Sequence, residues 1–240
     1  MSIQTEPAAS LGKAQILIVD DHPCARLGIS HYISQEPNLA VCGQASSGAK
    51  ALRAINLLNP DLVLVDLMLP GRDGLELIKQ VKAIHPDCRM LVFSMYDESL
   101  YAERALRAGA SGYVMKDEPS DRLMNAIHRA LAGETVLGRR AVERVLRRLS
   151  DGQSSLQATP MELLSDRELE IFRLIGDGRP RGQIAMDLNI SVKTVESHRT
   201  HIRRKMGFKN AAELYRYATQ FVQENSAPVP VSLSRDAERN

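Results

Sequence analysis

Short apolar runs alternate with amphipathic stretches along the first 134 residues of the chain. Two of these runs, Ile-Leu-Ile-Val at 16–19 and Leu-Val-Leu-Val at 62–65, are apolar at every position. An apolar run without polar alternation indicates a strand that is buried on both faces, as in a parallel sheet covered by helices. Five strands of this kind are predicted, at 16–19, 39–42, 62–65, 90–93 and 112–115.

Segments whose apolar residues have helical spacing lie between and after these strands. They are predicted helices at 23–35, 47–57, 74–84, 98–108 and 119–132. The alternation is a (βα)5 repeat, and right-handed crossovers make an α/β doubly wound sheet the expected fold. In such a sheet with the strand order 2-1-3-4-5, ligands bind beyond the carboxyl ends of the strands, beside the gap between the first and third strands.

The pattern changes after residue 134, and no further strand is predicted. Residues 135–162 are expected to be a linker with one short helix at 139–149, because Ser, Gln and Gly dominate the rest of the segment. Four helices then follow, at 165–176, 181–188, 192–206 and 211–222. We therefore expect a first domain at 15–134 and an all-α four-helix domain at 163–224. Residues 1–14 are expected to be a flexible extension and residues 225–240 a disordered tail.

The composition allows both domains to fold without covalent links. The apolar fraction is 44% and the charged fraction is 25%, which is ordinary for a globular protein. The cysteines Cys24, Cys42 and Cys88 have no C-x-x-C spacing, so we interpret them as small core residues rather than metal ligands. No apolar run approaches the roughly 18 residues of a membrane span, and residues 1–14 lack the basic start and apolar core that are typical of a signal peptide. A cytoplasmic protein without a membrane partner is expected.

The net charge of +2 conceals a difference between the two halves of the chain. Residues 1–134 contain 13 basic and 16 acidic side chains, whereas residues 135–240 contain 18 basic and 13 acidic ones. A mildly acidic half suits a metal or regulatory site, and a basic half suits a polyanion. The two domains are therefore expected to have different partners.

Three carboxylates follow the two neighbouring strands at the centre of the predicted sheet. Asp20 and Asp21 come directly after the first strand, and Asp66 follows the third. A single Asp at this place would be ordinary turn chemistry, but three that converge would repel one another unless a cation lay between them. Mg²⁺ bound by carboxylates, water and phosphoryl oxygens fits such a cluster.

The next two strands end in groups that complement these acids. Ser94 follows the fourth strand and Lys116 follows the fifth. A carboxylate can act as a covalent nucleophile toward a phosphoryl group, while Mg²⁺ and an ammonium group neutralise its charge and a hydroxyl donates to one of its oxygens. Together these strand ends predict a phosphoryl site at Asp66.

These residues resemble the receiver domain of two-component response regulators. The resemblance is carried by Asp20-Asp21-His22-Pro23, by Asp66 through Gly74, and by Gly112 through Asp117. It implies that Asp66 accepts a phosphoryl group from a sensor histidine kinase. It also implies that Asp20 or Asp21 holds Mg²⁺ together with Asp66 and the backbone carbonyl of Met68. Ser94 and Tyr113 match the family's switch pair, in which the hydroxyl turns toward the phosphoryl group and the aromatic ring moves inward.

A helix-turn-helix is predicted in the basic half. Ser165 and Glu168 form an S-x-x-E capping box that begins the first helix. A short turn at 189–191 separates the helix at 181–188 from the one at 192–206, and residues 191–209 contain six Lys or Arg against one Glu. Such a run can be merely a solvated helix face, but after a tight turn it favours contact with a DNA duplex.

This segment is similar to the LuxR-type helix-turn-helix, from Leu164-Ser165-Asp166-Arg167-Glu168 through Ile190 to His198. The resemblance implies that the third helix enters the major groove and that the fourth helix dimerises. It places Glu196, Ser197 and Thr200 toward the bases, where Glu196 would accept from a cytosine amino group. The other expected DNA-contact residues are Lys193, Thr194, His198, Arg203, Arg204 and Lys205.

Together the halves resemble a response regulator of the NarL/FixJ type. The resemblance implies a transcription regulator that is not an enzyme, apart from the phosphorylation and dephosphorylation of its own Asp66. Phosphorylation of Asp66 is expected to alter Ser94 and Tyr113, after which the receiver stops covering the recognition helix or exposes a dimer face. The expected partners are a sensor histidine kinase, promoter DNA, RNA polymerase and a second copy of the chain.

Two other functions are compatible with parts of this pattern. Haloacid dehalogenase-like phosphatases also use an Asp nucleophile, but they need a second Asp two residues later, where this chain has Met68. A regulator controlled by dimerisation or a ligand, without phosphate, is the nearer alternative. The complete set of pocket residues argues against it.

Overall fold

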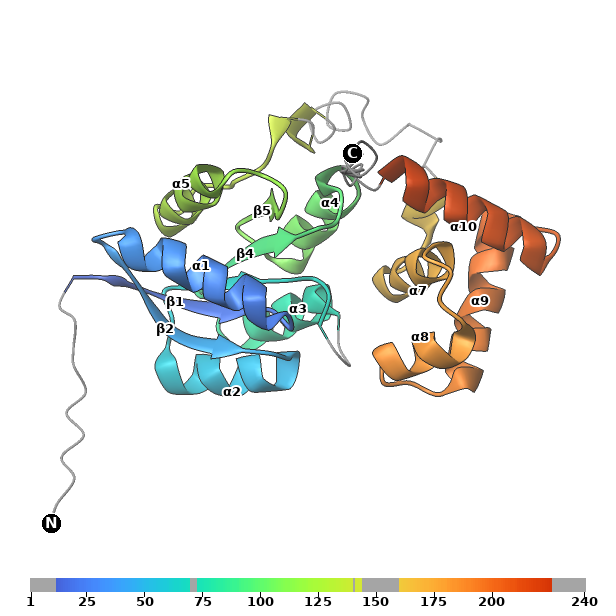
Figure 1. Ribbon diagram of the computed structural model, residues 1–240, viewed down its shortest axis with the longest axis horizontal. Helices are drawn as coiled ribbons and strands as arrows, with labels where there is room; N and C mark the ends of the chain where they lie inside the picture. Colours follow the sequence, from blue (N-terminus) through green and yellow to red (C-terminus); the bar gives the residue numbers. More distant parts are fainter. Residues whose placement is uncertain (1–11, 70–72, 140, 144–159, 226–240) are drawn as a thin grey trace, which may run out of the picture.

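The computed structural model describes residues 12–69, 73–139, 141–143 and 160–225 (Figure 1). They form an α/β receiver-like domain and, after the linker, a second domain of helices. In the part of the chain that is described, no helix is both long and apolar enough to cross a membrane.

The first domain is built on a parallel sheet of five strands. The strands are β1 (Ala14–Val19), β2 (Leu39–Ala45), β3 (Leu62–Val65), β4 (Arg89–Ser94) and β5 (Gly112–Met115). Their order is β2-β1-β3-β4-β5, which confirms the predicted doubly wound fold. Strands β1 and β3 pair in register, from Ile16 with Leu62 to Val19 with Val65. The residues that directly follow these strands, Asp20 and Asp66, therefore lie side by side at the same edge of the sheet.

Five helices cover the two faces of this sheet (Figure 1). They are α1 (Pro23–Gln35), α2 (Gly48–Leu58), α3 (Gly74–Ile84), α4 (Glu98–Ala108) and α5 (Ser120–Leu131). One face packs against α1 and α5 through residues such as Ile33 and Ile127, and the other against α2, α3 and α4 through residues such as Ile55 and Ile78. Because both faces are covered, β3 is buried along its whole length, as its apolar run predicts.

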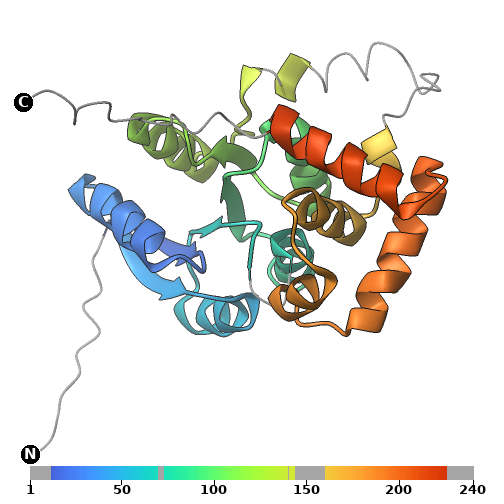
Figure 2. The same ribbon diagram turned by 45° about the vertical axis from the view of Figure 1, so that its right-hand side comes forward.

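The second domain consists of α7 (Asp166–Gly176), α8 (Arg181–Asp187), α9 (Val192–Met206) and α10 (Ala211–Asn225), preceded by the short helix η1 (Pro160–Leu163). Ser165 and Glu168 make the predicted capping box. Phe172, Val195, Ile202, Leu214 and Ala218 lie in the core of this domain. Figures 1 and 2 both show α7 and α8 between the first domain and α9.

Three details differ from the sequence-based expectations or add to them. Cys24 is exposed rather than a core residue, because it lies on the outer side of the first turn of α1; Cys42 and Cys88 are partly buried. Val136, beyond α5, forms a parallel bridge to Gly112, and its carbonyl accepts from the backbone N–H of Tyr113 at 2.8 Å. The short helix expected at 139–149 lies largely outside the described residues.

Gly74 allows α3 to begin close against the end of β3. Its N–H donates to the carbonyl of Leu67 at 2.9 Å, and a Cβ built on it would come within 2.4 Å of the Asp66 carbonyl oxygen. Gly74→Ala is therefore expected to lower the free energy of unfolding by about 1–3 kcal/mol through overpacking. Urea unfolding of the two chains measures this difference.

The matched control is Gly28→Ala in α1, where an added Cβ meets no atom within 4 Å. Gly28 occupies an exposed position of α1, so alanine there is expected to raise the free energy of unfolding by up to about 1 kcal/mol. Equal effects of the two substitutions would contradict the close approach of α3 to β3.

Candidate functional site: a phosphoryl pocket and a DNA-facing helix

The predicted acidic pocket forms at the carboxyl edge of the sheet. Asp20 follows β1 and is 2% exposed, while Asp66 follows β3 and is 4% exposed. Lys116, after β5, donates from its ammonium group to Oδ2 of Asp20 and to Oδ2 of Asp66, both at 2.6 Å. Three residues that are up to 96 positions apart in sequence thus form one hydrogen-bonded group.

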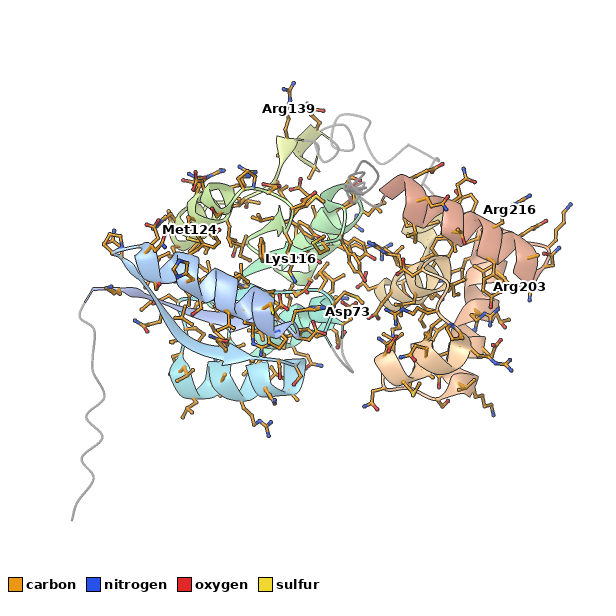
Figure 3. The ribbon with its side chains drawn as sticks, in the orientation of Figure 1. Asp73, Lys116, Met124, Arg139, Arg203 and Arg216 are labelled. Carbon is orange, nitrogen blue, oxygen red and sulfur yellow. The ribbon has the colours of Figure 1, made fainter. Side chains whose placement is uncertain are left out.

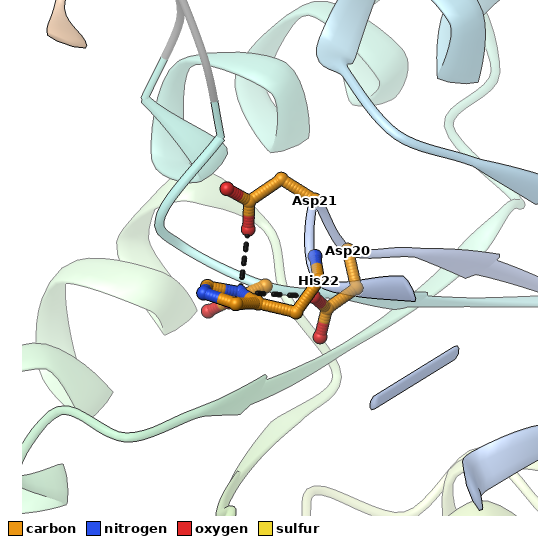
Figure 4. Close-up of side chains that lie close together, drawn as sticks. Asp20, Asp21 and His22 are labelled. Carbon is orange, nitrogen blue, oxygen red and sulfur yellow. Dashed lines mark hydrogen bonds and ion pairs between the residues drawn. The ribbon is translucent and has the colours of Figure 1, made fainter. Parts of the chain in front are cut away.

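Asp21 and His22 complete the rim of this pocket (Figure 4). Ligand atoms of Asp20, Asp21, His22 and Asp66 all lie within 4.8 Å of one another. Nδ1 of His22 is 2.8 Å from Oδ1 of Asp21 and 3.5 Å from Oδ1 of Asp20. His22 entered the sequence analysis only as part of a motif, and its contact with both acids depends on the turn that leads into α1.

Burial and charge act in opposite directions at the centre of the pocket. Burial raises the pKa of the Asp66 carboxyl, the Lys116 ammonium opposes this increase, and the charge of Asp20 adds to it. Burial alone would lower the pKa of Lys116, but the carboxylates of Asp66 and Asp20 outweigh burial and raise it. The ammonium therefore stays charged, and it compensates only part of the negative charge of its neighbours.

The donor set fits a hard divalent cation. Two carboxylates face one ammonium group in the buried part of the pocket, and Asp21 adds a third at the rim. Oδ1 of Asp21 is buried, and the His22 ring nitrogen Nδ1 lies 2.8 Å from it. Carboxylate oxygens at close range are ligands that Mg²⁺ prefers. This is an acidic pocket of the kind that is typical of Mg²⁺ binding.

The predicted switch residues lie beside the pocket and are connected through Tyr96. Ser94 and Tyr113 are both buried. The Tyr113 hydroxyl donates to the carbonyl of Tyr96 at 2.9 Å, and the N–H of Tyr96 donates to Oγ of Ser94 at 3.4 Å. Sequence analysis did not identify Tyr96, because an aromatic residue in a loop has no recognisable pattern by itself.

The basic helix α9 lies on the side of the second domain that faces away from the first domain. Figure 3 shows Asp73 on the side of the first domain that faces the second domain, and Arg203 on the far side of the second domain. Val195 and Ile202 are buried, as the apolar face predicted. The expected DNA-contact residues that are exposed are Lys193, Thr194, Ser197, Thr200, Arg204 and Lys205.

Several of the expected DNA-contact side chains are engaged within the domain. Glu196 accepts from Arg199 at 2.8 Å and lies 3.6 Å from Arg181 of α8. Lys205 donates to Glu168 of the capping box at 2.6 Å, and Arg203 reaches the carbonyl of Lys209 at 3.4 Å.

His198 is half-buried. Burial, and to a smaller extent the charge of Arg167, lowers its pKa, so its imidazole is largely neutral at pH 7. Arg181, which sequence analysis did not select, is exposed beside Glu196. The polar face of the helix therefore presents fewer free cations than the sequence suggests.

A cavity of about 730 Å³ lies between the two domains, over the acidic pocket. The first domain contributes Asp66, Lys116 and Tyr96, among others, and the second contributes Glu170, Asp177, Arg179, Met186, Asp187 and Leu188. The pocket around Asp66 thus opens toward α7 and α8, which no local sequence pattern indicates.

Comparison with known proteins agrees with this geometry. Residues 16–128 match the response regulator receiver domain, and residues 162–218 match the bacterial regulatory proteins of the luxR family. The oxygen regulatory protein NreC of Staphylococcus aureus is 35% identical over 208 residues, which cover 85% of this chain and 96% of NreC.

Solved structures of the regulator RcsB are similar as well. RcsB from Salmonella enterica serovar Typhimurium, bound to promoter rprA with the phosphomimetic BeF₃⁻, is 26% identical with a TM-score of 0.62. That match covers 87% of this chain and 99% of RcsB. A structure of two RcsB dimers bound to two parallel DNAs is 25% identical with a TM-score of 0.53, covering 87% and 98%.

The fold and the site define a two-domain signalling protein, with a receiver that is coupled to a DNA-binding helical domain. The chain belongs to the response regulators of the NarL/FixJ type, which join a receiver domain to a LuxR-type helix-turn-helix. It is a DNA-binding transcription regulator of two-component signalling.

Asp73 gives the receiver a measurable pH dependence. Its Oδ1 accepts from the N–H of Leu75 at 2.9 Å at the start of α3, and burial, together with Glu170 and Asp166 of α7, raises its pKa to about 7. The folded state therefore binds this proton more tightly than the unfolded chain does. Stability is lost as the pH rises from about 4 to about 7.

Asp73→Asn keeps a capping side chain but removes this charge. Between pH 5 and pH 8 the free energy of unfolding of the wild type is expected to fall by on the order of 2 kcal/mol relative to that of the variant. Urea unfolding at both pH values measures the difference, and parallel pH profiles of the two chains would refute the raised pKa.

Proposed function

We propose that Asp66 accepts a phosphoryl group from a sensor histidine kinase and that this modification switches dimerisation and promoter binding. The observation that carries the proposal is the contact of Lys116 with two buried carboxylates at the end of the sheet. In this mechanism an oxygen of Asp66 attacks the phosphorus, the bond from phosphorus to the donor breaks, and the donor leaves with the electron pair.

The pocket residues divide the remaining tasks. Asp20, Asp21, Asp66 and the backbone carbonyl of Met68 would hold Mg²⁺, which when bound neutralises charge on the phosphoryl oxygens. Lys116 neutralises a further oxygen, and the Ser94 hydroxyl donates to another. Tyr113 then follows Ser94 as the second member of the switch pair. The buried positions of Ser94 and Tyr113 beside Asp66 support these roles.

The pocket favours a persistent phosphoryl group over enzymatic turnover. Met68 occupies the position two residues after the nucleophile, where a phosphatase of the haloacid dehalogenase type would place its acid/base Asp. Its backbone N–H, 3.3 Å from Oδ1 of Asp66, orients the carboxylate but cannot serve as a general base. The chain is therefore proposed to catalyse only its own phosphorylation and dephosphorylation.

The second domain is proposed to bind double-stranded promoter DNA with α9 in the major groove. The exposed Lys193, Thr194, Ser197, Thr200 and Arg204 are the first candidates for contact, and His198, Arg203, Lys205 and Glu196 follow because each is half-buried or engaged within the domain. We add Arg181, which is exposed at the start of α8 beside Glu196. Phosphate contacts from the cations would position the helix, and the polar side chains would distinguish bases.

A homodimer is proposed as the DNA-bound form. Helix α10 exposes Tyr215 and Tyr217 on the surface of the second domain, which suits contact with a second copy. The RcsB structure with dimers on DNA supports this arrangement by analogy. RNA polymerase is the proposed further partner, and the cytoplasm is the proposed compartment, where kinase output and promoter DNA are both accessible.

Replacement of the phosphoacceptor tests the switch directly. The full chain would be treated with phosphoramidate and Mg²⁺, and its binding measured to a duplex selected from a random-sequence pool. Wild type is expected to gain at least roughly fivefold in affinity, because allosteric couplings are typically of this size or larger. Asp66→Asn is expected to gain nothing, since its amide does not form the acyl phosphate.

Asp87→Asn is the matched control, because Asp87 is exposed at the opposite edge of the sheet. It is expected to respond like wild type. Equal binding by wild type and Asp66→Asn after treatment would favour the regulator that works without phosphate.

Substitutions of two neighbouring cations on α9, Arg204 and Lys205, distinguish an effect on DNA binding from an effect on domain stability. Arg204 is exposed, so Arg204→Gln is expected to reduce the slope of log K against log salt by about 0.9, as for one phosphate contact, without loss of stability. Lys205→Gln removes the ion pair with Glu168 and is expected to cost about 1 kcal/mol of domain stability. Salt titrations of DNA binding and urea unfolding measure the two effects; identical behaviour of both variants would contradict this division.

A further inference from the structure

One arginine of α9 is held between that helix and α10. Arg199 is only 12% exposed, although it is a long charged side chain on a helix with a polar face. Its Nη2 donates to the hydroxyl of Tyr215 of α10 at 2.8 Å, and its guanidinium carbon lies 5.0 Å from the centroid of the Tyr215 ring. A cation that contacts both a ring and a hydroxyl of one residue has little freedom to move.

The same guanidinium group fixes Glu196. Nη1 of Arg199 donates to Oε1 of Glu196 at 2.8 Å, about one helical turn earlier. Arg181 of α8 approaches the same oxygen at 3.6 Å, but its side chain is 65% exposed. An exposed ion pair usually contributes little, because the ordering of both side chains offsets their attraction. Here Tyr215 already orders Arg199, so the pair with Glu196 holds the carboxylate in one place.

Glu196 keeps one oxygen for a partner outside the domain. Both arginines lie at Oε1, and in the described part of the chain Oε2 accepts no hydrogen bond. The side chain is 42% exposed, on the helix that is proposed to enter the major groove. A carboxylate in that groove can accept from the amino group of cytosine, whereas guanine and thymine present acceptors that it repels. Glu196 is therefore able to distinguish one base when its direction is fixed.

We propose that Arg199 and Tyr215 are positioning residues for Glu196. This relay, from Tyr215 through Arg199 to Glu196, makes the second domain select cytosine at one position of its binding site. The inference rests on the proposed function, because it specifies how α9 reads the duplex that it is proposed to contact. Sequence analysis selected Glu196 but neither of the two residues that hold it. Neither Arg199 nor Tyr215 is assigned a base contact; each acts through the carboxylate.

The relay is expected to act on base preference rather than on general affinity. A carboxylate near the duplex is repelled by the phosphates whatever the base sequence. Only a hydrogen bond to the correct base compensates for this repulsion, and that bond needs the carboxylate within about 0.5 Å of the productive position. A carboxylate that is free to rotate keeps the repulsion but makes the bond for only part of the time. Loss of the relay therefore reduces the preference at one base pair.

Base preference can be measured position by position on the full chain. A duplex would be selected from a random-sequence pool with the wild-type chain, and affinities measured for it and for each of its single-base-pair variants. Glu196→Gln identifies the base pair that Glu196 reads, because an amide both donates and accepts and no longer selects cytosine. Wild type is expected to prefer cytosine there by roughly 5- to 150-fold, the usual cost of one mismatched base pair.

Tyr215→Phe tests the relay without removal of the aromatic ring. It deletes the hydroxyl that accepts from Arg199, and it is expected to reduce the preference for cytosine at that base pair roughly 3- to 10-fold, as for the loss of one hydrogen bond. Arg199→Gln, which is too short to contact both partners, is expected to reduce this preference at least as much.

Tyr217→Phe is the matched control on α10. Tyr217 is 39% exposed, against 41% for Tyr215, and its ring packs against Phe172 and Phe208 rather than against Arg199. This variant is expected to keep the wild-type preference at every base pair.

A double-mutant cycle distinguishes positioning of Glu196 from a general effect on the domain. In the Glu196→Gln background the relay has no carboxylate to hold, so Tyr215→Phe is expected to change no base preference further. Urea unfolding monitors the stability of each variant. The relay is overturned if Tyr215→Phe keeps the wild-type preference, weakens binding to all duplexes equally, or has the same effect with Gln at position 196 as with Glu196.

Failure of the relay and failure of the proposed DNA contact give different results. If Glu196→Gln changes one base preference and Tyr215→Phe changes none, the relay fails and the contact of α9 with DNA stands. If Glu196→Gln changes no base preference and Arg204→Gln leaves the salt dependence of binding unchanged, the placement of α9 in the groove fails, and the relay fails with it.

Discussion

The contact of one ammonium group with two buried carboxylates organises the receiver domain. Lys116 reaches Asp20 and Asp66 at the same distance, 2.6 Å, and connects the ends of β1, β3 and β5. Removal of either partner from such a group would leave a buried charge without compensation. The pocket nevertheless retains excess negative charge, because Asp21 lies at its rim. This excess of negative charge favours a divalent cation, as is typical of an Mg²⁺-binding acidic pocket.

The pocket is not isolated from the rest of the molecule. Ser94 and Tyr113 both contact the backbone of Tyr96, and the ring of Tyr96 contacts Arg173 of the second domain. Met68 also connects Tyr96 to Asp66, because its N–H lies 3.3 Å from Oδ1 of Asp66 and its Sδ contacts the Tyr96 hydroxyl.

Charge has different uses in the two domains. In the receiver the acids gather at one edge of the sheet, while in the second domain several cations of α9 bind acidic groups of their own domain, as Lys205 does with Glu168 and Arg199 with Glu196. These pairs orient the helix and reduce the number of cations that are free for DNA phosphates. Recognition by the second domain therefore depends on a smaller set of exposed side chains than its charge count indicates.

The sequence by itself determined the parallel sheet, the order of its helices, the capping box of α7 and the residues of the acidic pocket. These features depend on local periodicity and on the rule that the ends of parallel strands meet at one edge. The exposure of Cys24 and the contact between Tyr96 and Arg173 could not be predicted from the sequence, because burial and ring contacts depend on which surfaces pack together. Only the tertiary structure decided that α7 rather than α9 faces the receiver. That choice follows from the fit of one guanidinium group on two stacked rings and of one carboxylate between two cations. Arg104 and Asp166 are 62 positions apart in the sequence, and Tyr96 and Arg173 are farther apart still.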